Sequence, residues 1–219
     1  MISPKYSTTH YSLGIKALST AKSAPHVVNL FFDYNCPFSA KLYLKLYNKV
    51  IPELQKTHPD KFQFVYINVV QPWHTNSTLL NEFGLAYAKV LREKNIDDSQ
   101  KLFWDFNKVV YQDKEQFYDN STIELTRNQI YEKIYDVVAK DLDLKVGKDD
   151  LLKELLIKSG GEPDNAGNGA TADVKYFTRI VRNTGIHVTP TVTVDGVVDD
   201  SISSGTSEDE LIKVFTAKL

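Results

Sequence analysis

The sequence predicts an α/β protein with a mixed β-sheet and a long all-helical insertion. Residues 27–33 and 62–70 have the apolar character of buried strands, with a helical stretch between them. A block of about 90 residues with helical spacing follows, and Asp195-Gly196 then marks a tight hairpin between two more strands. A right-handed crossover makes the first two strands parallel and the hairpin makes the last two antiparallel, so the predicted sheet is mixed, with helices on both faces.

The first expected elements are an edge strand, a main strand and a long helix. Tyr11 to Ile15 is expected to form a short edge strand, and residues 27–33 form the first main strand. The next helix is expected from Pro37 to about Lys56, because a proline in the first turn needs no amide donor. Pro52 lies late in this helix and predicts a kink or a break.

The helical block is expected to contain four helices. Their apolar positions at helical spacing span Leu79 to Leu91, Leu102 to Val110, Ile130 to Val138 and Leu151 to Leu156. Aromatic side chains are frequent in this block, and most are expected in the core because helices on a sheet need a large apolar face. Residues 159–169, rich in glycine and asparagine, are expected to form a connector.

The C-terminal part returns to the sheet. A helix is expected from Thr171 to Asn183, with Gly185 as its C-terminal cap. The third strand is expected from Val188 to Val194 and the fourth from Val197. The last helix opens at Ser207 and ends near Leu219.

This order of elements predicts two domains. Residues 1–76 and 170–219 contain all the main predicted strands and form the sheet domain. Residues 77–169 form the helical insertion between them.

The composition narrows the classes of function. The chain has 219 residues, a formal net charge of −2 and a pI near 6.2, so nucleic acid and anionic membrane are not expected as partners. Its apolar runs are too short to span a bilayer, and its first residues show no hydrophobic secretory segment. One cysteine excludes an intrachain disulfide, so a reducing, cytoplasmic environment is expected. No spacing of His, Cys, Asp and Glu suits a metal.

The single cysteine, Cys36, lies between the first strand and the first helix, in Asn35-Cys36-Pro37-Phe38-Ser39. A thiol at a helix N-terminus lies at the positive end of the helix dipole, which favours the reactive thiolate. Ser39, one turn into the helix, is expected to donate a hydrogen bond to that thiolate. The alternative is that Cys36 is buried and inert and packs as a small hydrophobe.

These residues and a second, distant motif resemble the thioredoxin superfamily. Phe31 to Ser39 is similar to the strand and active-site stretch of its DsbA-like branch, and Gly185 to Gly196, which contains Thr189-Pro190-Thr191, is similar to its proline loop. The helical block also resembles that branch, which includes the kappa-class glutathione transferases. The resemblance covers roughly residues 27–219 and implies a thioredoxin-like fold with an inserted helical subdomain.

The resemblance implies roles for individual residues. Cys36 matches the nucleophilic cysteine of the family, Pro190 its cis-proline and Thr189 the residue before that proline. In the family this loop faces the nucleophile and pairs with an extended substrate. We therefore expect Thr189 and Pro190, together with Pro37 and Phe38, to contact the substrate.

The sequence departs from the family at Ser39, where the dithiol enzymes carry a resolving cysteine. An intrachain Cys-x-x-Cys mechanism is therefore excluded, and release of a mixed disulfide needs an outside thiol. The resemblance implies a monothiol CxxS thiol–disulfide oxidoreductase that acts through Cys36 on protein or glutathione mixed disulfides. No bound cofactor is expected for such a protein, and glutathione is the expected co-substrate.

Two other functions remain open. Loss of the second cysteine is also what a non-catalytic binding module would show, if it kept the fold and held a peptide or partner in the groove. A kappa-class-like glutathione transferase or isomerase is a further alternative, although that class typically has serine where this chain has Cys36.

Trp73 and His74 follow the second strand. Parallel strands end at the same edge of a sheet, so both residues are expected beside Cys36, with His74 as a base or cation and Trp73 as a wall of the groove. The alternative is that Pro72 and Trp73 only turn the chain. His187, close to the proline loop, is a weaker candidate. The remaining histidines are expected on the surface or in loops: His10, His26 and His58.

Overall fold

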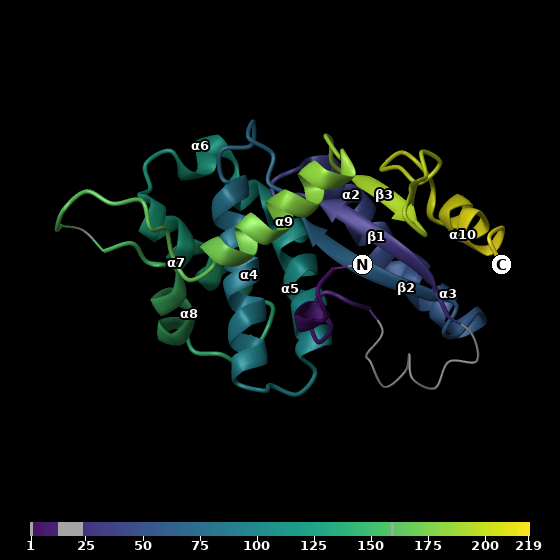
Figure 1. Ribbon diagram of the computed structural model, residues 1–219, viewed down its shortest axis with the longest axis horizontal. Helices are drawn as coiled ribbons and strands as arrows, with labels where there is room; N and C mark the ends of the chain where they lie inside the picture. Colours follow the sequence, from purple (N-terminus) through teal and green to yellow (C-terminus); the bar gives the residue numbers. More distant parts are fainter. Residues whose placement is uncertain (1, 13–23, 159) are drawn as a thin grey trace.

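The computed structural model describes residues 2–12, 24–158 and 160–219. Figure 1 shows a sheet flanked by helices, with a cluster of helices at one end. The elements up to the second main strand are η1 (Pro4–Tyr6), β1 (His26–Phe32), α2 (Pro37–Lys45), η2 (Leu46–Val50), α3 (Ile51–Thr57) and β2 (Phe62–Asn68). Those that follow are α4 (Ser77–Glu93), α5 (Ser99–Gln112), η3 (Lys114–Phe117), α6 (Asp119–Thr122), α7 (Arg127–Val138), α8 (Lys148–Leu155), α9 (Thr171–Thr184), β3 (Thr191–Val194), β4 (Val197–Val198) and α10 (Glu208–Thr216).

The predicted mixed sheet is confirmed. Its strand order is β2-β1-β3-β4. β1 and β2 are parallel, with His26 in register with Phe62, whereas β3 is antiparallel to both β1 and β4. Every residue of β2 is buried, as expected for a parallel strand that is covered on both faces.

β2 and β3 are shorter than the sequence predicts, and β1 is shifted by one residue towards the N-terminus. β1 ends before Asp33, because the backbone N–H of Asp33 turns away from the sheet and bonds to Ser39 Oγ at 3.4 Å. β3 begins at Thr191 instead of Val188. Pro190 directly precedes it, and a proline has no N–H to donate to a strand ladder.

The predicted first helix is continuous but contains a wider turn. α2 leads into the π-turn η2, in which the N–H of Ile51 bonds to the carbonyl of Leu46, and then into α3. Pro52 follows this turn directly, and its ring and missing N–H would disrupt an α-helical ladder. A π-turn is one of the identifiable ways in which a helix absorbs such a defect.

The four predicted helices of the insertion are α4, α5, α7 and α8, and Gly185 caps α9 in the left-handed region at φ 68°. η3 and α6 are not predicted, because elements of four residues carry too little periodicity. In Figure 1, α4, α7 and α8 cluster at one end of the sheet, and α9 crosses from them towards the strands. Since α9 packs against both α4 and β2, the predicted boundaries of the insertion at 77 and 169 stay a prediction.

Among the helices of the described ranges, none is both long and apolar enough to cross a bilayer.

The N-terminal segment pairs with the free edge of β2. Tyr11 forms an antiparallel bridge with Val65, and the N–H of Tyr66 donates to the carbonyl of His10 at 2.8 Å. This is the start of the predicted edge strand, whose residues 13–15 lie outside the described residues.

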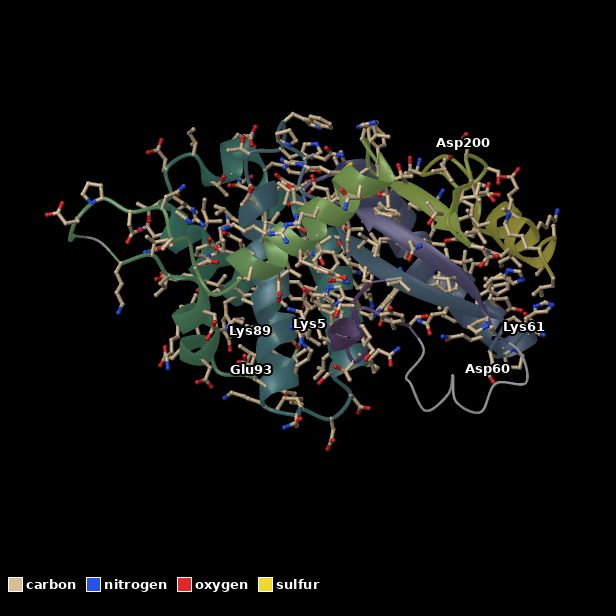
Figure 2. The ribbon with its side chains drawn as sticks, viewed as in Figure 1. Lys5, Asp60, Lys61, Lys89, Glu93 and Asp200 are labelled. Carbon is tan, nitrogen blue, oxygen red and sulfur yellow. The ribbon has the colours of Figure 1, made fainter. Side chains whose placement is uncertain are left out.

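Ionic and polar bonds attach the same segment to the helices. Figure 2 shows Lys5 beside α4, from which Lys89 and Glu93 project. Lys5 Nζ pairs with Asp173 of α9 at 2.6 Å, and the hydroxyl of Tyr6 donates to the same carboxylate at 2.9 Å.

His10 was predicted on the surface or in a loop. It lies in a turn, but the surface alternative is wrong, because the residue is fully buried. Its ring stacks on Phe103 and Phe177 with centroid distances of 4.3 and 5.2 Å. Its Nε2 lies 3.0 Å from Asn68 Oδ1. Burial lowers the pKa of His10 to about 3, so the ring is a neutral core residue that the local sequence does not reveal.

Candidate active site around Cys36

Cys36 lies where β1 passes into α2, as the sequence predicts. It is the N-cap residue of α2, with an extended backbone at φ −83° and ψ 119°. Its N–H donates to the carbonyl of Asp33 at 3.1 Å, and its own carbonyl accepts the N–H of Ala40. The helix dipole therefore points its positive end at this residue.

The proline loop lies directly against the sulfur. Cys36 Sγ is 3.4 Å from the carbonyl oxygen of Thr189, and the Thr189–Pro190 peptide bond is cis. Two motifs separated by more than 150 positions in the sequence thus meet at one point. The thiol therefore donates to a backbone acceptor of the proline loop.

Cys36 is more buried than an open nucleophile would be. Its residue exposure is 3%, whereas nearby Phe38 and Val188 are each 60% exposed. Pro37 is also exposed, and Thr189 and Pro190 are half-buried. The sulfur therefore lies below a rim of apolar side chains on both sides, and a reagent reaches it only between them.

Ser39 does not contact the sulfur. Its side chain is fully buried, and its Oγ accepts the N–H of Asp33 at 3.4 Å. Among the described residues no hydrogen bond joins Ser39 to Cys36, so the predicted bond to the thiolate is not found. The hydroxyl instead fixes the turn between the strand and the helix.

Asp33 connects most of the polar groups of the site, and the sequence alone did not single it out. Its side chain is fully buried and lies 2.6 Å from His74 Nδ1. It also accepts bonds from the hydroxyl of Ser77 at 2.7 Å and the N–H of Asn35 at 3.1 Å. Burial raises the pKa of the Asp33 carboxyl, while the bonds from His74, Ser77 and Asn35 act in the opposite direction.

The segment after β2 lies at the same edge, as predicted. His74 is attached to Asp33, with 22% of its side chain exposed, and the ring of Trp73 is 61% exposed. Gln71, which the sequence did not single out, donates through Nε2 to the carbonyl of His187 at 3.2 Å. This bond joins the end of β2 to the start of the proline loop, and the side chain of His187 itself is exposed.

One loop of the helical insertion borders the site. The side chains of Asn35 and Asn76 both donate to the carbonyl of Phe117, at 3.3 and 2.8 Å. Tyr118 follows directly and is half-buried. Burial raises the pKa of its phenol, and the charges of Glu115 and Cys36 add to this effect.

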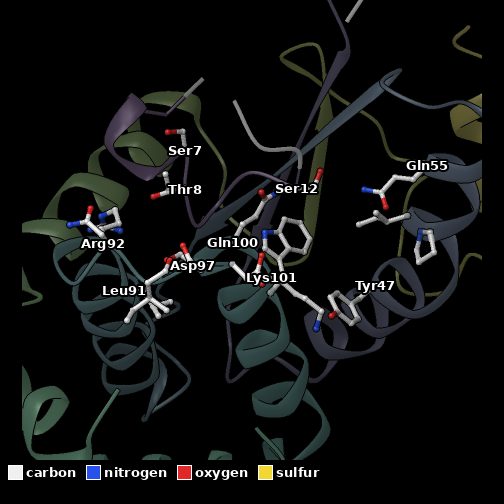
Figure 3. Close-up of a pocket in the computed structure, with 17 residues that line it drawn as sticks. Ser7, Thr8, Ser12, Tyr47, Gln55, Leu91, Arg92, Asp97, Gln100 and Lys101 are labelled. Atoms are coloured by element: carbon white, nitrogen blue, oxygen red, sulfur yellow. The ribbon is translucent and has the colours of Figure 1, made fainter. Parts of the chain in front are cut away.

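A cavity of about 1000 Å³ lies elsewhere, between η2, α3 and the turn from α4 to α5 (Figure 3). Tyr47, Gln55, Arg92 and Lys101 are among its lining residues, and Cys36 is not. Tyr47 is eleven positions further along the helix that starts at Cys36, which corresponds to about 17 Å. The cavity is therefore separate from the site. No group of His, Cys, Asp and Glu that could hold a metal occurs within the described ranges.

The sheet order, the insertion and the juxtaposed cysteine and proline loop define a thioredoxin-like fold of the DsbA type. A family model described as Thioredoxin matches residues 19–213, and the chain belongs to this family. A search of curated proteins found no match.

Solved structures share the fold at low sequence identity. A protein from Pseudomonas syringae described as a protein-disulfide isomerase is 22% identical, with a TM-score of 0.64 over 87% of this chain and 93% of the other. The thiol-disulfide exchange protein alpha-DsbA2 from Wolbachia pipientis is 17% identical, with a TM-score of 0.58 over 97% and 88%. BdbD from Bacillus subtilis is 22% identical, with a TM-score of 0.54 over 90% and 89%. At these identities the likeness establishes the fold.

Proposed function

We propose that this protein catalyses thiol–disulfide exchange with Cys36 as its only nucleophile. The observation that carries the proposal is the position of Cys36 Sγ, at a helix N-terminus and 3.4 Å from the carbonyl of Thr189 in a cis-proline loop. The thiolate is the attacking species in such reactions, and the helix dipole favours it. The similar Wolbachia protein, a thiol-disulfide exchange protein, supports this chemistry in the same fold.

The proposed substrate is a glutathione mixed disulfide of a protein. The Cys36 thiolate attacks the glutathione sulfur, a bond forms between the two sulfurs, and the protein leaves as a thiolate that takes up a proton. A second glutathione thiolate then attacks the adduct, which yields glutathione disulfide and restores the Cys36 thiolate. Each cycle exchanges one disulfide for another: the protein sulfur is reduced to a thiol, and one reduced glutathione is consumed and leaves joined to the glutathione of the substrate. The cycle therefore needs reduced glutathione and no bound cofactor. We place the protein in the cytoplasm on this ground.

The rim residues are assigned to substrate contact. Phe38 and Trp73 expose 60% and 61% of their surface, which leaves both rings free to cover an apolar side chain of a partner. Pro37 and the Thr189–Pro190 loop complete the rim around the sulfur. Ser39 acts indirectly, because it holds the N–H of Asp33.

The test is mass spectrometry of protein isolated from cells, followed by turnover of a glutathionylated peptide with glutathione present. The expected result is a glutathione adduct on Cys36 and peptide reduction, both absent in Cys36→Ala. The absence of both the adduct and the turnover in the original protein contradicts the proposal.

A second function is favoured by the low exposure of Cys36, which is 3%. A non-catalytic module that holds a peptide against the exposed rings of Phe38 and Trp73 needs no accessible sulfur. In that case a bound partner is retained by Cys36→Ala but lost in Phe38→Ala. If the protein is an enzyme, turnover is instead lost in Cys36→Ala. The effect of Cys36→Ala therefore separates the two functions.

A further inference from the structure

Asp33 and His74 form a pair that runs from the interior to the surface beside Cys36. The carboxylate is fully buried, the imidazole is 22% exposed, and Asp33 Oδ2 is 2.6 Å from His74 Nδ1. Ser77 Oγ and the N–H of Asn35 hold the other carboxylate oxygen. A carboxylate fixed in this way holds the ring with its Nδ1–H towards Asp33, which leaves Nε2 as the nitrogen for proton transfer.

The same residue also positions the nucleophile. The backbone carbonyl of Asp33 accepts the N–H of Cys36 at 3.1 Å, so the imidazole and the thiol are attached to one residue. Within the described ranges, His74 Nε2 has no hydrogen-bond partner. We infer that His74 is the base that takes the proton from the thiol which attacks the Cys36 adduct, and that Asp33 is its positioning residue. This inference rests on the proposed function.

The need for a base follows from the single cysteine. An outside thiol arrives mostly protonated at neutral pH, because a free thiol titrates near 8.5, and only its thiolate attacks a disulfide. In the inferred step, His74 Nε2 accepts the proton of glutathione as its sulfur bonds to the sulfur of the adduct. The bond to Cys36 breaks, and Cys36 leaves as a thiolate. The imidazolium then gives this proton to solvent, and the thiolate that leaves the next substrate takes up a proton from solvent, so the proton count of each cycle balances.

Few other titratable groups face this pair. The phenol of Tyr111, on α5, lies near both Asp33 and Cys36, and burial raises its pKa well above the usual value. Tyr118 lies near Cys36 with Glu115 beside it, and the pKa of Tyr118 is also raised. Both phenols therefore stay protonated at neutral pH, so neither competes with His74 Nε2 as a proton acceptor.

The experiment separates the two halves of the cycle in single-turnover measurements. Reduced protein is mixed with a glutathionylated peptide to measure adduct formation, and the purified adduct is then mixed with glutathione to measure release. In His74→Gln, release at pH 7 should slow at least about tenfold. This is less than the roughly 10²–10⁴-fold usual for a proton-transfer group, because thiols also ionise unaided. Adduct formation should change less than about twofold, because it begins from a thiolate.

A thiol that is already ionised provides the decisive comparison. Release of the adduct by 5-thio-2-nitrobenzoate at pH 7, or by glutathione above pH 9, should be equally fast in His74→Gln and in the original protein. Asp33→Asn should show the same pattern more weakly, although its buried position also affects stability. His58→Gln serves as the control, since His58 lies at the C-terminal end of α3, with its Nδ1 2.9 Å from Thr57 Oγ1.

The outcomes distinguish a failure of the inference about His74 from a failure of the proposed function. Suppose that the adduct forms, and that His74→Gln slows release by glutathione and by 5-thio-2-nitrobenzoate equally, or slows release by neither thiol. The inference about His74 is then wrong, and the proposed function stands. If no adduct forms in the original protein, the proposed function itself fails.

Discussion

The side-chain amide of Asn76 donates a 2.8 Å hydrogen bond to the carbonyl of Phe117 and another of 2.8 Å to Thr122 Oγ1. Asn35, the neighbour of Cys36, donates to the same Phe117 carbonyl at 3.3 Å. Two loops next to the sheet are therefore attached to one point of the helical insertion. The insertion in this way fixes the backbone that carries the nucleophile.

Asn76→Ala should lower the free energy of unfolding by about 1–3 kcal/mol, because it removes two buried hydrogen bonds and leaves the Phe117 carbonyl with only the longer bond from Asn35. Urea denaturation measures this. Asn120→Ala is the matched control, since Asn120 is exposed, and its effect should stay within about 0.5 kcal/mol. Equal effects of the two substitutions would show that the hydrogen bonds of the Asn76 amide contribute nothing to stability.

Gly84→Ala should destabilise the protein although alanine favours helices. A Cβ at Gly84 would lie 2.8 Å from the hydroxyl of Tyr34, which is buried and donates to Asn107 Oδ1 at 2.6 Å. The gain in helix propensity is about 1 kcal/mol, whereas overpacking costs about 1–3 kcal/mol. The net loss should shrink in a Tyr34→Phe background, where the crowded oxygen is absent; denaturation of the four proteins of this cycle measures it.

His10 should make stability depend on pH. Its pKa is lowered to about 3 by burial, against about 6.5 in an unfolded chain. Below pH 6.5 the unfolded state therefore binds one more proton than the folded state, so this contribution is present above that pH and is lost as pH falls. The expected slope is about 1.4 kcal/mol per pH unit between pH 6 and 4. His10→Gln should flatten the dependence in denaturation series at these pH values, and an unchanged slope would refute the assignment.

Gln71→Ala should increase the access to Cys36. The substitution removes the 3.2 Å bond from Gln71 to the carbonyl of His187, which holds the loop whose Thr189 covers the sulfur. Alkylation of the native protein by iodoacetamide should become several-fold faster, with a loss of about 1 kcal/mol in stability. Gln55→Ala, far from the site on α3, is the control and should leave the alkylation rate unchanged.

The architecture was predictable where periodicity is strong. The helices of the insertion and the hairpin at Asp195-Gly196 follow from apolar spacing and turn chemistry, and the structure contains them. The positions of Cys36 and Thr189 were predictable only through the family resemblance. A Thr-Pro dipeptide alone does not predict that it lies against a thiol.

The polar interior was not predictable from local sequence. Asp33 ends a strand and resembles a solvated turn residue, and only the fold brings it against His74 and Ser77. His10 has no periodic neighbours, yet Phe103 and Phe177 enclose it. Ser39 was given a bond to the sulfur because both belong to one turn, but its hydroxyl points to the backbone of Asp33.

The presence of one cysteine and no second thiol has a practical consequence for finding partners. Enzymes with two thiols must be mutated before they retain a covalently bound client, because the second sulfur frees the first. The sequence has no such second sulfur, so extracts prepared without small thiols should preserve the glutathione adduct of Cys36, and also any protein whose own sulfur Cys36 attacks in place of the glutathione sulfur. A protein recovered in this way under non-reducing conditions is attached through Cys36.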